Sequence, residues 1–269
     1  GNRRKIIINT FSNDFDLTSD YLTSLIVLAG QKISDETAAI NTVQEFLNDM
    51  QQFPVDVDLE KTKNFNAKIN YTTTPQLFAI TNGVLERVDS LSDANVIRVD
   101  LYQKEIEYDL ETGRVWSPTK KIKMPIIYPH PPQSTMDFTI ASGQNEAEVV
   151  EAHFKHQAVD RQPTEIATYP IKTAEEAFAQ LQEGQAYVAS SPYAPNSSDN
   201  QVQINNVYLA YYLGEADQDY LYPVFVFEDR NGFFAFVPAI KELPTPEEEA
   251  SAEGGTETGT ETEAPAETQ

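Results

Sequence analysis

Few side chains in this sequence are suited to metal or acid–base chemistry, and the histidines come first. Only His153 and His156 are close together in the chain. On a helix, two histidines three positions apart could share a zinc ion, but the apolar alternation around them favours a strand. Strand positions three apart point to opposite faces, which argues against a shared metal. His130 lies between two prolines and is expected at the surface, so no metal site is predicted.

The sequence shows no motif for nucleophilic catalysis either. Ser190–Ser191 and Ser197–Ser198 lie in a segment rich in Pro and Asn, without a Gly-x-Ser-x-Gly turn. The chain has no cysteine, which excludes thiolate nucleophiles, disulfides and Cys-ligated metals. Gly254–Gly255 lacks the Lys-Ser/Thr sequel of a phosphate loop. No pair of acids stands out as a glycosidase pair, which is defined by separation in space. We therefore predict no catalytic residue, no cofactor and no enzyme.

Four tyrosines are the most suggestive group for binding. They cluster around one expected strand pair and are Tyr208, Tyr212, Tyr220 and Tyr222. Tyrosine is favoured at protein interfaces because it is amphipathic and has few rotamers to lose. The commoner alternative is cross-strand packing, with the hydroxyl groups reaching water. The nearby segment 190–201 is long for a hairpin connection, so it is either a recognition loop or extra loop length that the fold tolerates.

Composition limits the class of partner. The 269 residues include 42 acidic and 19 basic side chains, which gives a net charge of −23. This excess argues against nucleic acid as a partner and against adsorption of the globular surface to anionic lipid. A hydrophobic content of 40% is enough for a packed core. Residues 244–269 contain no basic or aromatic side chain, and we expect them to form a disordered acidic tail.

The elements that must position these residues are of mixed type. Ser34 is a suitable N-cap for a helix to about Met50, and Thr173 with Glu176 forms a capping box for a second helix. Between them, the proline-rich stretch 117–133 is expected to be an extended surface connector. Alternating or β-rich patterns predict strands over 64–72, 77–89, 95–110, 135–141, 147–156, 185–190, 202–213, 220–228 and 233–240.

Two local signals refine the expected strands. Asn231-Gly232 predicts a hairpin between the last two, because both residues tolerate positive φ. Pro223, near the start of its strand, suggests an edge or bulge position. The strand over 95–110 is apolar on both parities, which is typical of a central strand covered on both faces.

The start of the chain leaves two interpretations open. Gly1 stands where a natural chain would have Met, and neither a signal peptide nor a membrane-spanning run is present. The Ile6–Ile8 run is too short for either role. The chain is either a cytoplasmic protein with a cloning remnant at its start or an extracytoplasmic domain cut from its anchor.

The C-terminal half resembles a known family. The segment YPIKTAEEAFAQLQEG (169–184) is similar to the helix of PepSY-like modules. VYLAYY (207–212), YLYPVFVFE (220–228) and FAFVPAI (234–240) are similar to strands of the YycH/YycI family. The similarity extends more loosely to SDANVIRVDLY (92–102), as in uncharacterised single-span bacterial membrane proteins. Glu228-Asp229 stands where the family often has Glu-Gly, which indicates a slightly different turn.

The expected elements and this resemblance together predict an α+β protein of two halves, in which an antiparallel sheet is covered by one helix in each half and the C-terminal half is PepSY-like. The resemblance implies a domain held at the extracytoplasmic face of the cell membrane by an N-terminal helix outside this sequence. Together with the lack of catalytic motifs, it predicts a non-enzymatic binding or regulatory domain. The partner would be an envelope or membrane protein. A peptidase inhibitor, a hydrolase and a structural spacer remain alternatives for function, and secretion remains an alternative for location.

The expected division of the chain follows from these segments. It comprises a juxtamembrane segment (1–33), an α+β subdomain (34–116), the proline-rich connector (117–133), a PepSY/YycI-like subdomain (134–243) and the acidic tail (244–269).

Overall fold

The protein is a mixed α and β structure dominated by antiparallel sheet. The computed structural model describes residues 3–29, 33–58, 75–109, 121–143, 145–161, 169–193 and 201–241. The helices are α1 (Leu25–Ala29), α2 (Glu36–Asp49) and α4 (Ala174–Gln182), with a 3-10 turn η1 (Tyr21–Thr23). The strands are β1 (Arg4–Ile8), β2 (Phe15–Ser19), β3 (Gln76–Thr81), β4 (Val84–Arg87), β5 (Val96–Asp100), β6 (Ile106–Asp109), β7 (Lys121–Met124), β8 (Ile126–Ile127), β9 (Met136–Ser142), β10 (Ala147–Phe154), β11 (Tyr187–Ser190), β12 (Asn206–Tyr212), β13 (Tyr222–Glu228) and β14 (Phe234–Pro238).

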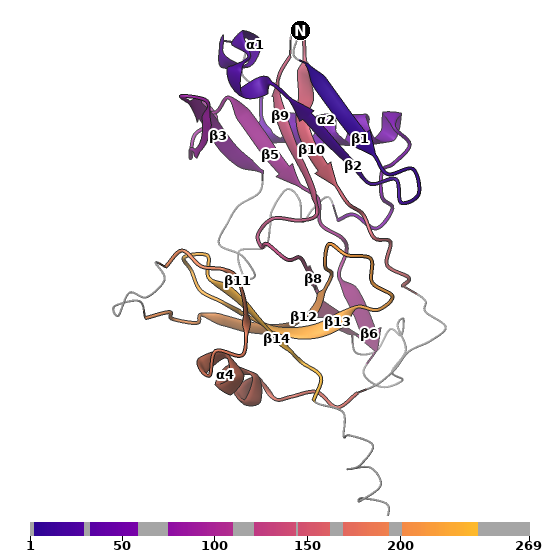
Figure 1. Cartoon of the computed structure of the whole chain (residues 1–269), viewed down its shortest axis with the longest axis vertical. Helices are drawn as coiled ribbons and strands as arrows, with labels where there is room; N and C mark the ends of the chain where they lie inside the picture. Colours follow the sequence, from indigo (N-terminus) through magenta and orange to yellow (C-terminus); the bar gives the residue numbers. More distant parts are fainter. Residues whose placement is uncertain are drawn as a thin grey trace, which may run out of the picture.

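Two sheets define two lobes (Figure 1). The N-terminal lobe is the sheet β1-β2-β10-β9-β5-β3-β4 with α1 and α2, and all its strand pairs are antiparallel. The C-terminal lobe is the sheet β11-β14-β13-β12-β8 with α4, in which β8 and β12 pair in parallel. Strands β6 and β7 form a separate ribbon.

The sheet order departs from the division expected from the sequence. Strands β9 and β10, expected in the subdomain 134–243, lie in the middle of the N-terminal lobe beside β5 and β2. The expected juxtamembrane segment 1–33 supplies β1, β2 and α1 to the same lobe. The connector 117–133 contributes β7 and β8, and β8 extends the second sheet. Strand pairing over more than a hundred residues, rather than local composition, sets these boundaries.

One face of the N-terminal sheet is packed by α2. Asp35, one residue after the predicted cap, begins this helix by accepting a hydrogen bond from the Ala38 amide at 2.7 Å. Apolar residues of α2 are buried against the sheet; Ile40, Val43 and Leu47 are at most 1% exposed. Full burial of side chains of this size contributes roughly 1.5–3 kcal/mol each.

The opposite face of the N-terminal sheet is divided in two. Near α1, Val27 and Tyr21 pack on Val96 and Val150. Further along the strands, the register aligns a row of charged side chains: Asp100, Asp137, His153 and Asp16. This part of the face is therefore polar. β5 is a central strand, as predicted, since it lies between β3 and β9, but the single strand expected over 95–110 is wrong, because β5 ends at Asp100 and β6 belongs to the separate ribbon.

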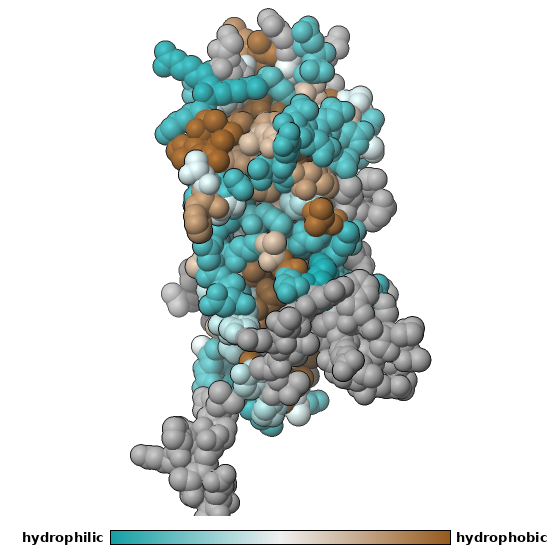
Figure 2. Space-filling model, turned by 90° about the vertical axis from the view of Figure 1, so that its right-hand side faces the viewer, coloured by the Kyte–Doolittle hydropathy of each residue, from teal (hydrophilic) through white to brown (hydrophobic). Residues whose placement is uncertain are grey.

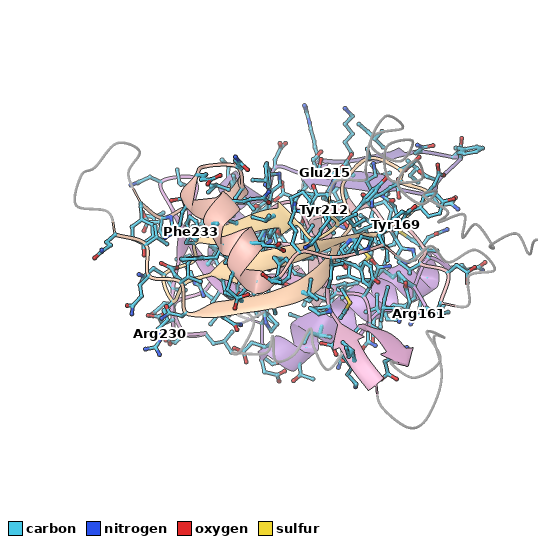
Figure 3. All side chains as sticks on the ribbon, turned by 90° about the horizontal axis from the view of Figure 1, so that it is seen from below. Arg161, Tyr169, Tyr212, Glu215, Arg230 and Phe233 are labelled. Carbon is cyan, nitrogen blue, oxygen red and sulfur yellow. The ribbon has the colours of Figure 1, made fainter. Side chains whose placement is uncertain are left out.

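In the C-terminal lobe, α4 covers one face of the sheet, as seen from below in Figure 3. The predicted capping box is present: the Thr173 hydroxyl accepts from the Glu176 amide at 3.2 Å, and the Glu176 carboxylate accepts from the Thr173 amide at 2.7 Å. Gly184 ends the helix region with a φ of +74°. Ala177 of α4 packs on Phe225 and other residues of the sheet.

Tight turns connect several of the strand pairs. The predicted hairpin at Asn231-Gly232 joins β13 and β14, with Gly232 at a φ of +99°. A second hairpin, at Asn82-Gly83, joins β3 and β4 with φ values of 53° and 77°. The sequence pattern treated 77–89 as one strand and missed this turn, although Asn-Gly is a strong hairpin signal. The edge position suggested by Pro223 is wrong, because β13 lies between β12 and β14. Pro223 is tolerated there as the second residue of the strand.

Other expectations fall outside the described residues. These are the strand at 64–72, the acidic tail 244–269 and most of the loop 190–201. Within the described part of the chain, no helix has the length and apolar character needed to cross a membrane.

Candidate functional site

The structure brings two of the four predicted tyrosines directly together. Tyr212 at the end of β12 pairs with Tyr222 at the start of β13. Directly opposed residues of an antiparallel pair share one sheet face, so both rings belong to the face opposite α4. Tyr222 is 52% exposed. Among the described elements, no helix packs on this second face.

Two further aromatic residues, which the sequence analysis missed, join this face. Tyr187 on β11 lies with its ring 6.0 Å from that of Phe236, and Tyr212 lies 5.9 Å from the same ring. Phe236 is buried, whereas Tyr187 is 53% exposed. We call Tyr187, Tyr212 and Tyr222 the tyrosine rim. The alternating side chains of β11 could have indicated that Tyr187 lies on a strand. They do not reveal which strand lies beside β14.

Tyr208 has a structural role instead. It shares the face of Tyr212, but its hydroxyl reaches the Glu228 carboxylate at 3.5 Å. Glu228 is fully buried and also accepts from the Asn206 amide nitrogen at 2.9 Å. Burial raises the pKa of Glu228 to about 7, against the opposing effect of these two donors. Burial and the adjacent Glu228 raise the pKa of Tyr208 well above its usual value.

Tyr220 lies on the connection between β12 and β13, which is held in place by two glutamines. The Gln218 side chain accepts from the Gly214 amide at 2.7 Å and donates to the carbonyl groups of Tyr212 and Tyr220. Gln157, which follows β10 in the other lobe, donates to the carbonyl groups of Gly214 and Ala216 at 3.0 and 3.1 Å. The connection is thus ordered by contacts from both lobes, and Tyr220 is 60% exposed on it.

The same connection carries three exposed carboxylates, Glu215, Asp217 and Asp219. Glu215 lies next to Tyr212 when the molecule is seen from below (Figure 3). Burial raises the pKa of Tyr212, with smaller contributions from Tyr187 and from the negative charge of Glu215. The tyrosine rim therefore has an acidic border.

The histidines do not form a metal site. His153 contacts Asp16 at 2.7 Å, whereas His156 contacts Asp56 at 2.8 Å. His130 is exposed and lies 3.8 Å from Glu215. No group of three metal-ligating side chains occurs within the described residues.

The His156–Asp56 pair belongs to the junction between the lobes. Gln103 is buried there and donates to Asp56 at 2.8 Å and to the carbonyl group of Gln157 at 2.9 Å. Burial raises the pKa of Asp56, but the hydrogen bonds from His156 and Gln103 outweigh it, so the net shift is downward. Through Gln157 the arrangement joins the lobes.

The charged row on the N-terminal sheet is the most perturbed acidic group of that lobe. Arg98 reaches Asp137 at 3.1 Å and Asp100 at 3.6 Å. Asp100 is fully buried, and burial raises its pKa to about 7 despite Arg98. Its Oδ2 and the Arg98 Nε have no hydrogen-bond partner among the described atoms. The row lies on a flat sheet face, and the cleft described next does not include it.

An open cleft of about 900 Å³ lies elsewhere on the N-terminal lobe, between α1, α2 and the β9–β10 turn. Apolar side chains such as Ile33 and Phe46 line it together with polar ones such as Asn41 and Glu45. The ion pair between Arg4 and Glu148 lies at its wall. Its lining includes carboxylates such as Glu45 and Asp49, but no histidine and none of the acids with a raised pKa.

Comparison of the chain with models of known protein families, with curated proteins and with solved structures found no match. The candidate site therefore depends on geometry alone. The tyrosine rim is the feature that combines exposed aromatic rings, an ordered connection and a sheet face on which no described helix packs.

Proposed function

We propose that the chain is a non-enzymatic binding or regulatory domain that acts through protein–protein contacts at the cell envelope. The partner contacts the tyrosine rim. The observation that carries this proposal is the exposure of Tyr187 and Tyr222, 53% and 52%, on a sheet face that no described helix covers. Half-exposed tyrosines around a buried ring are typical of the surfaces that proteins use to bind one another.

The ordering of the rim supports a binding role. The two glutamines fix the β12–β13 connection before any partner arrives, and Phe236 fixes the orientation of the flanking rings. A surface that is already ordered loses less conformational entropy on association.

The location is proposed on the sequence resemblance. A PepSY- or YycI-like C-terminal half implies an N-terminal membrane tether and an extracytoplasmic position. An envelope or membrane protein is then the expected partner. The N-terminal end of β1 lies at the end of the N-terminal lobe far from the rim (Figure 1), so a tether there leaves the rim accessible.

Site-specific photocrosslinking tests this proposal in native membranes of cells that make the full-length protein. A photoreactive residue replaces Tyr222, and a matched one replaces Val84, which is 61% exposed on β4 of the other lobe. We expect mass spectrometry to identify one envelope protein at position 222, with capture lost on Tyr187→Ala. Identical products at both positions, or none at 222, would contradict the proposal and favour a structural spacer.

An inhibitor of an envelope peptidase would be recognised in the same experiment, because the captured protein would be a peptidase. Activity of that peptidase with and without the purified chain would then separate inhibition from simple docking.

A further inference from the structure

Strand β1 leaves an open backbone edge at one side of the N-terminal sheet. Its five residues pair with β2 in an unbroken register from Arg4–Ser19 to Ile8–Phe15. It is the first strand in the sheet order, so only one of its edges is paired. Ile6, Ile7 and Ile8 are 45%, 55% and 46% exposed. Figure 2 looks onto this side of the molecule and shows hydrophobic side chains between hydrophilic ones on the N-terminal lobe.

The other outer strands of the two large sheets are shorter than β1. β4 has four residues and ends in Glu86 and Arg87, β8 has two residues, and β11 is interrupted by a bulge after Val188. Short length, charge and bulges are the usual means of preventing strand addition. β1 carries charge at Arg4 and Lys5, but it has no bulge and no proline, and three consecutive isoleucines follow. It is the longest uninterrupted outer strand of the two large sheets.

Two backbone hydrogen bonds define which polar groups of β1 point outward. The Asp20 amide donates to the Arg3 carbonyl at 3.4 Å, and the Asn9 amide donates to the Asp14 carbonyl at 2.8 Å. Residues 3 and 9 therefore point their polar groups towards β2. Because the direction alternates along a strand, residues 5 and 7 do the same. Arg4, Ile6 and Ile8 present their N–H and C=O groups to the open side.

The side chains of β1 are also sorted by face. Ile6 and Ile8 pair with Leu17 and Phe15, which belong to the core under α2. Lys5 and Ile7 lie on the opposite face, with Arg3 next in the same alternation. Arg3 and Lys5 form no ion pair with any described residue, whereas Arg4 pairs with Glu148. The edge thus offers apolar side chains on the core side and two cations on the other.

We propose that β1 binds an extended segment of another protein, which adds as an eighth strand and alternates apolar with acidic residues. Its apolar residues would lie on the face of Ile6 and Ile8. Its acidic residues would lie on the face of Lys5 and Arg3. Main-chain hydrogen bonds give such strand addition its affinity, and alternate side chains give its specificity.

A second copy of this chain fits the edge less well. Antiparallel self-pairing centred on Ile6 places Arg4 opposite Ile8 and Lys5 opposite Ile7, so the cations find no acid. It also turns the two N-termini to opposite ends of the pair, which conflicts with tethering of both copies to one membrane. This last point rests on the proposed function, whereas the charge argument does not.

The test uses the purified full chain and fluorescein-labelled octapeptides of defined pattern. The probe alternates glutamate with valine. One control alternates lysine with valine and so reverses the charge, and the other is a block peptide, four glutamates followed by four valines, which keeps the composition but loses the alternation. We expect fluorescence anisotropy to show about tenfold tighter binding of the alternating Glu-Val peptide than of either control, given the ion pairs and strand hydrogen bonds involved. Failure of this peptide to bind, or equal binding of all three, overturns the proposal.

Variants at one position separate the backbone contribution from the side-chain contribution. Ile6→Pro removes an outward N–H without removing a β1–β2 hydrogen bond, and Ile6→Ala removes the side chain but keeps that N–H. Proline should weaken binding of the alternating Glu-Val peptide about tenfold relative to alanine. Lys5→Glu should weaken it about fivefold at low salt and less at high salt. Equal affinity of the proline and alanine variants would overturn strand addition.

Light scattering on the peptide-free chain identifies the competing occupant. A dimer that dissociates on Ile6→Pro would show that a second copy fills the edge and would overturn the proposal, whereas a monomer is expected. Because the tyrosine rim lies in the other lobe, photocrosslinking at Tyr222 remains independent of this outcome, and the two proposals can fail separately.

Discussion

The two lobes treat the second face of their sheets in opposite ways. In each lobe, one face is packed by a helix, α2 in the first and α4 in the second. The remaining face of the N-terminal sheet is apolar where α1 packs on it and elsewhere carries the row along Asp100, Asp137 and His153. The corresponding face of the C-terminal sheet carries Phe234, Phe236 and the tyrosine rim. Phe234 and Phe236 are buried, and the half-exposed rings of Tyr187 and Tyr222 beside them are the side chains that favour a protein partner.

The lobes nevertheless share one feature, a fully buried carboxyl group with a raised pKa. Burial raises the pKa of Asp100 in the first lobe and that of Glu228 in the second, each to about 7. Neither residue lines the cleft described above. Because both lobes have such an acid, a raised pKa alone does not identify the lobe that binds a partner. The exposed surface of each lobe is the better guide.

The largest expected effect comes from the centre of the aromatic face. Phe236→Ala removes a ring that is 3% exposed and that contacts both Tyr187 and Tyr212. We expect a loss of about 3–5 kcal/mol in the free energy of unfolding, as for other buried Phe→Ala changes. Urea denaturation measures it. A loss below about 1 kcal/mol would show that this face is not part of the core.

The next effect is a pH dependence that compares the two buried acids. In each, the folded-state pKa lies above the unfolded value, so the folded state holds more protons between about pH 4 and 7. Their contribution to stability is therefore lost as pH rises through that window. Asp100→Asn and Glu228→Gln should each flatten the fall, by roughly 3 kcal/mol between pH 4.5 and 8.

Chemical denaturation at several pH values measures this flattening, and the double variant should show the sum. Both changes keep side-chain shape and remove only the ionisable group. If the single variants retain the wild-type slope, the fall arises from other groups in the chain.

A smaller effect should follow from loosening the rim without touching its rings. Gln157→Ala removes three hydrogen bonds to the β12–β13 connection, two that the side chain donates and one that it accepts from the Gln218 amide, which predicts a loss of roughly 1 kcal/mol in unfolding free energy. Photocrosslinking at Tyr222 should fall about fivefold, since the connection is then less ordered. Unchanged capture would indicate that the rim does not depend on support from the other lobe.

The smallest expected effect on stability is at an exposed residue of the rim. Tyr222→Ser should change the unfolding free energy by less than about 0.5 kcal/mol, because half of the ring is already in water. Partner capture by a photoreactive residue at Tyr187 should nevertheless be lost. The matched change Val84→Ser on the N-terminal lobe should alter neither the unfolding free energy nor partner capture.

Local features of the fold could be predicted from the sequence, and long-range ones could not. The α4 capping box at Thr173 and the hairpin at Gly232 follow from short-range backbone chemistry, and both were found. The positions of β9 and β10 depend on pairing with strands far along the chain, which no local pattern encodes. The hairpin at Asn82-Gly83 was predictable from its residues and was overlooked.

The candidate site shows the same limit. Tyr212 and Tyr222 could be paired because their strands are consecutive and the register is set locally. Tyr187 joins them only through β14 and the ring of Phe236, so its role depends on the order of strands across the sheet. Tyr208 shows the opposite error. Its place in the sequence grouped it with the other three tyrosines, but its hydroxyl group is bonded to Glu228.

The pairing of β2 with β10 has a consequence for the order in which the chain acquires its structure. Phe15 pairs with Phe154, so the N-terminal lobe closes only after synthesis has passed Phe154. Until then the β1–β2 hairpin, with its isoleucines, lacks the neighbouring strand β10. Contacts so distant in sequence slow folding and prolong exposure of aggregation-prone segments. During synthesis, this hairpin is therefore the part of the lobe that stays exposed for the longest time.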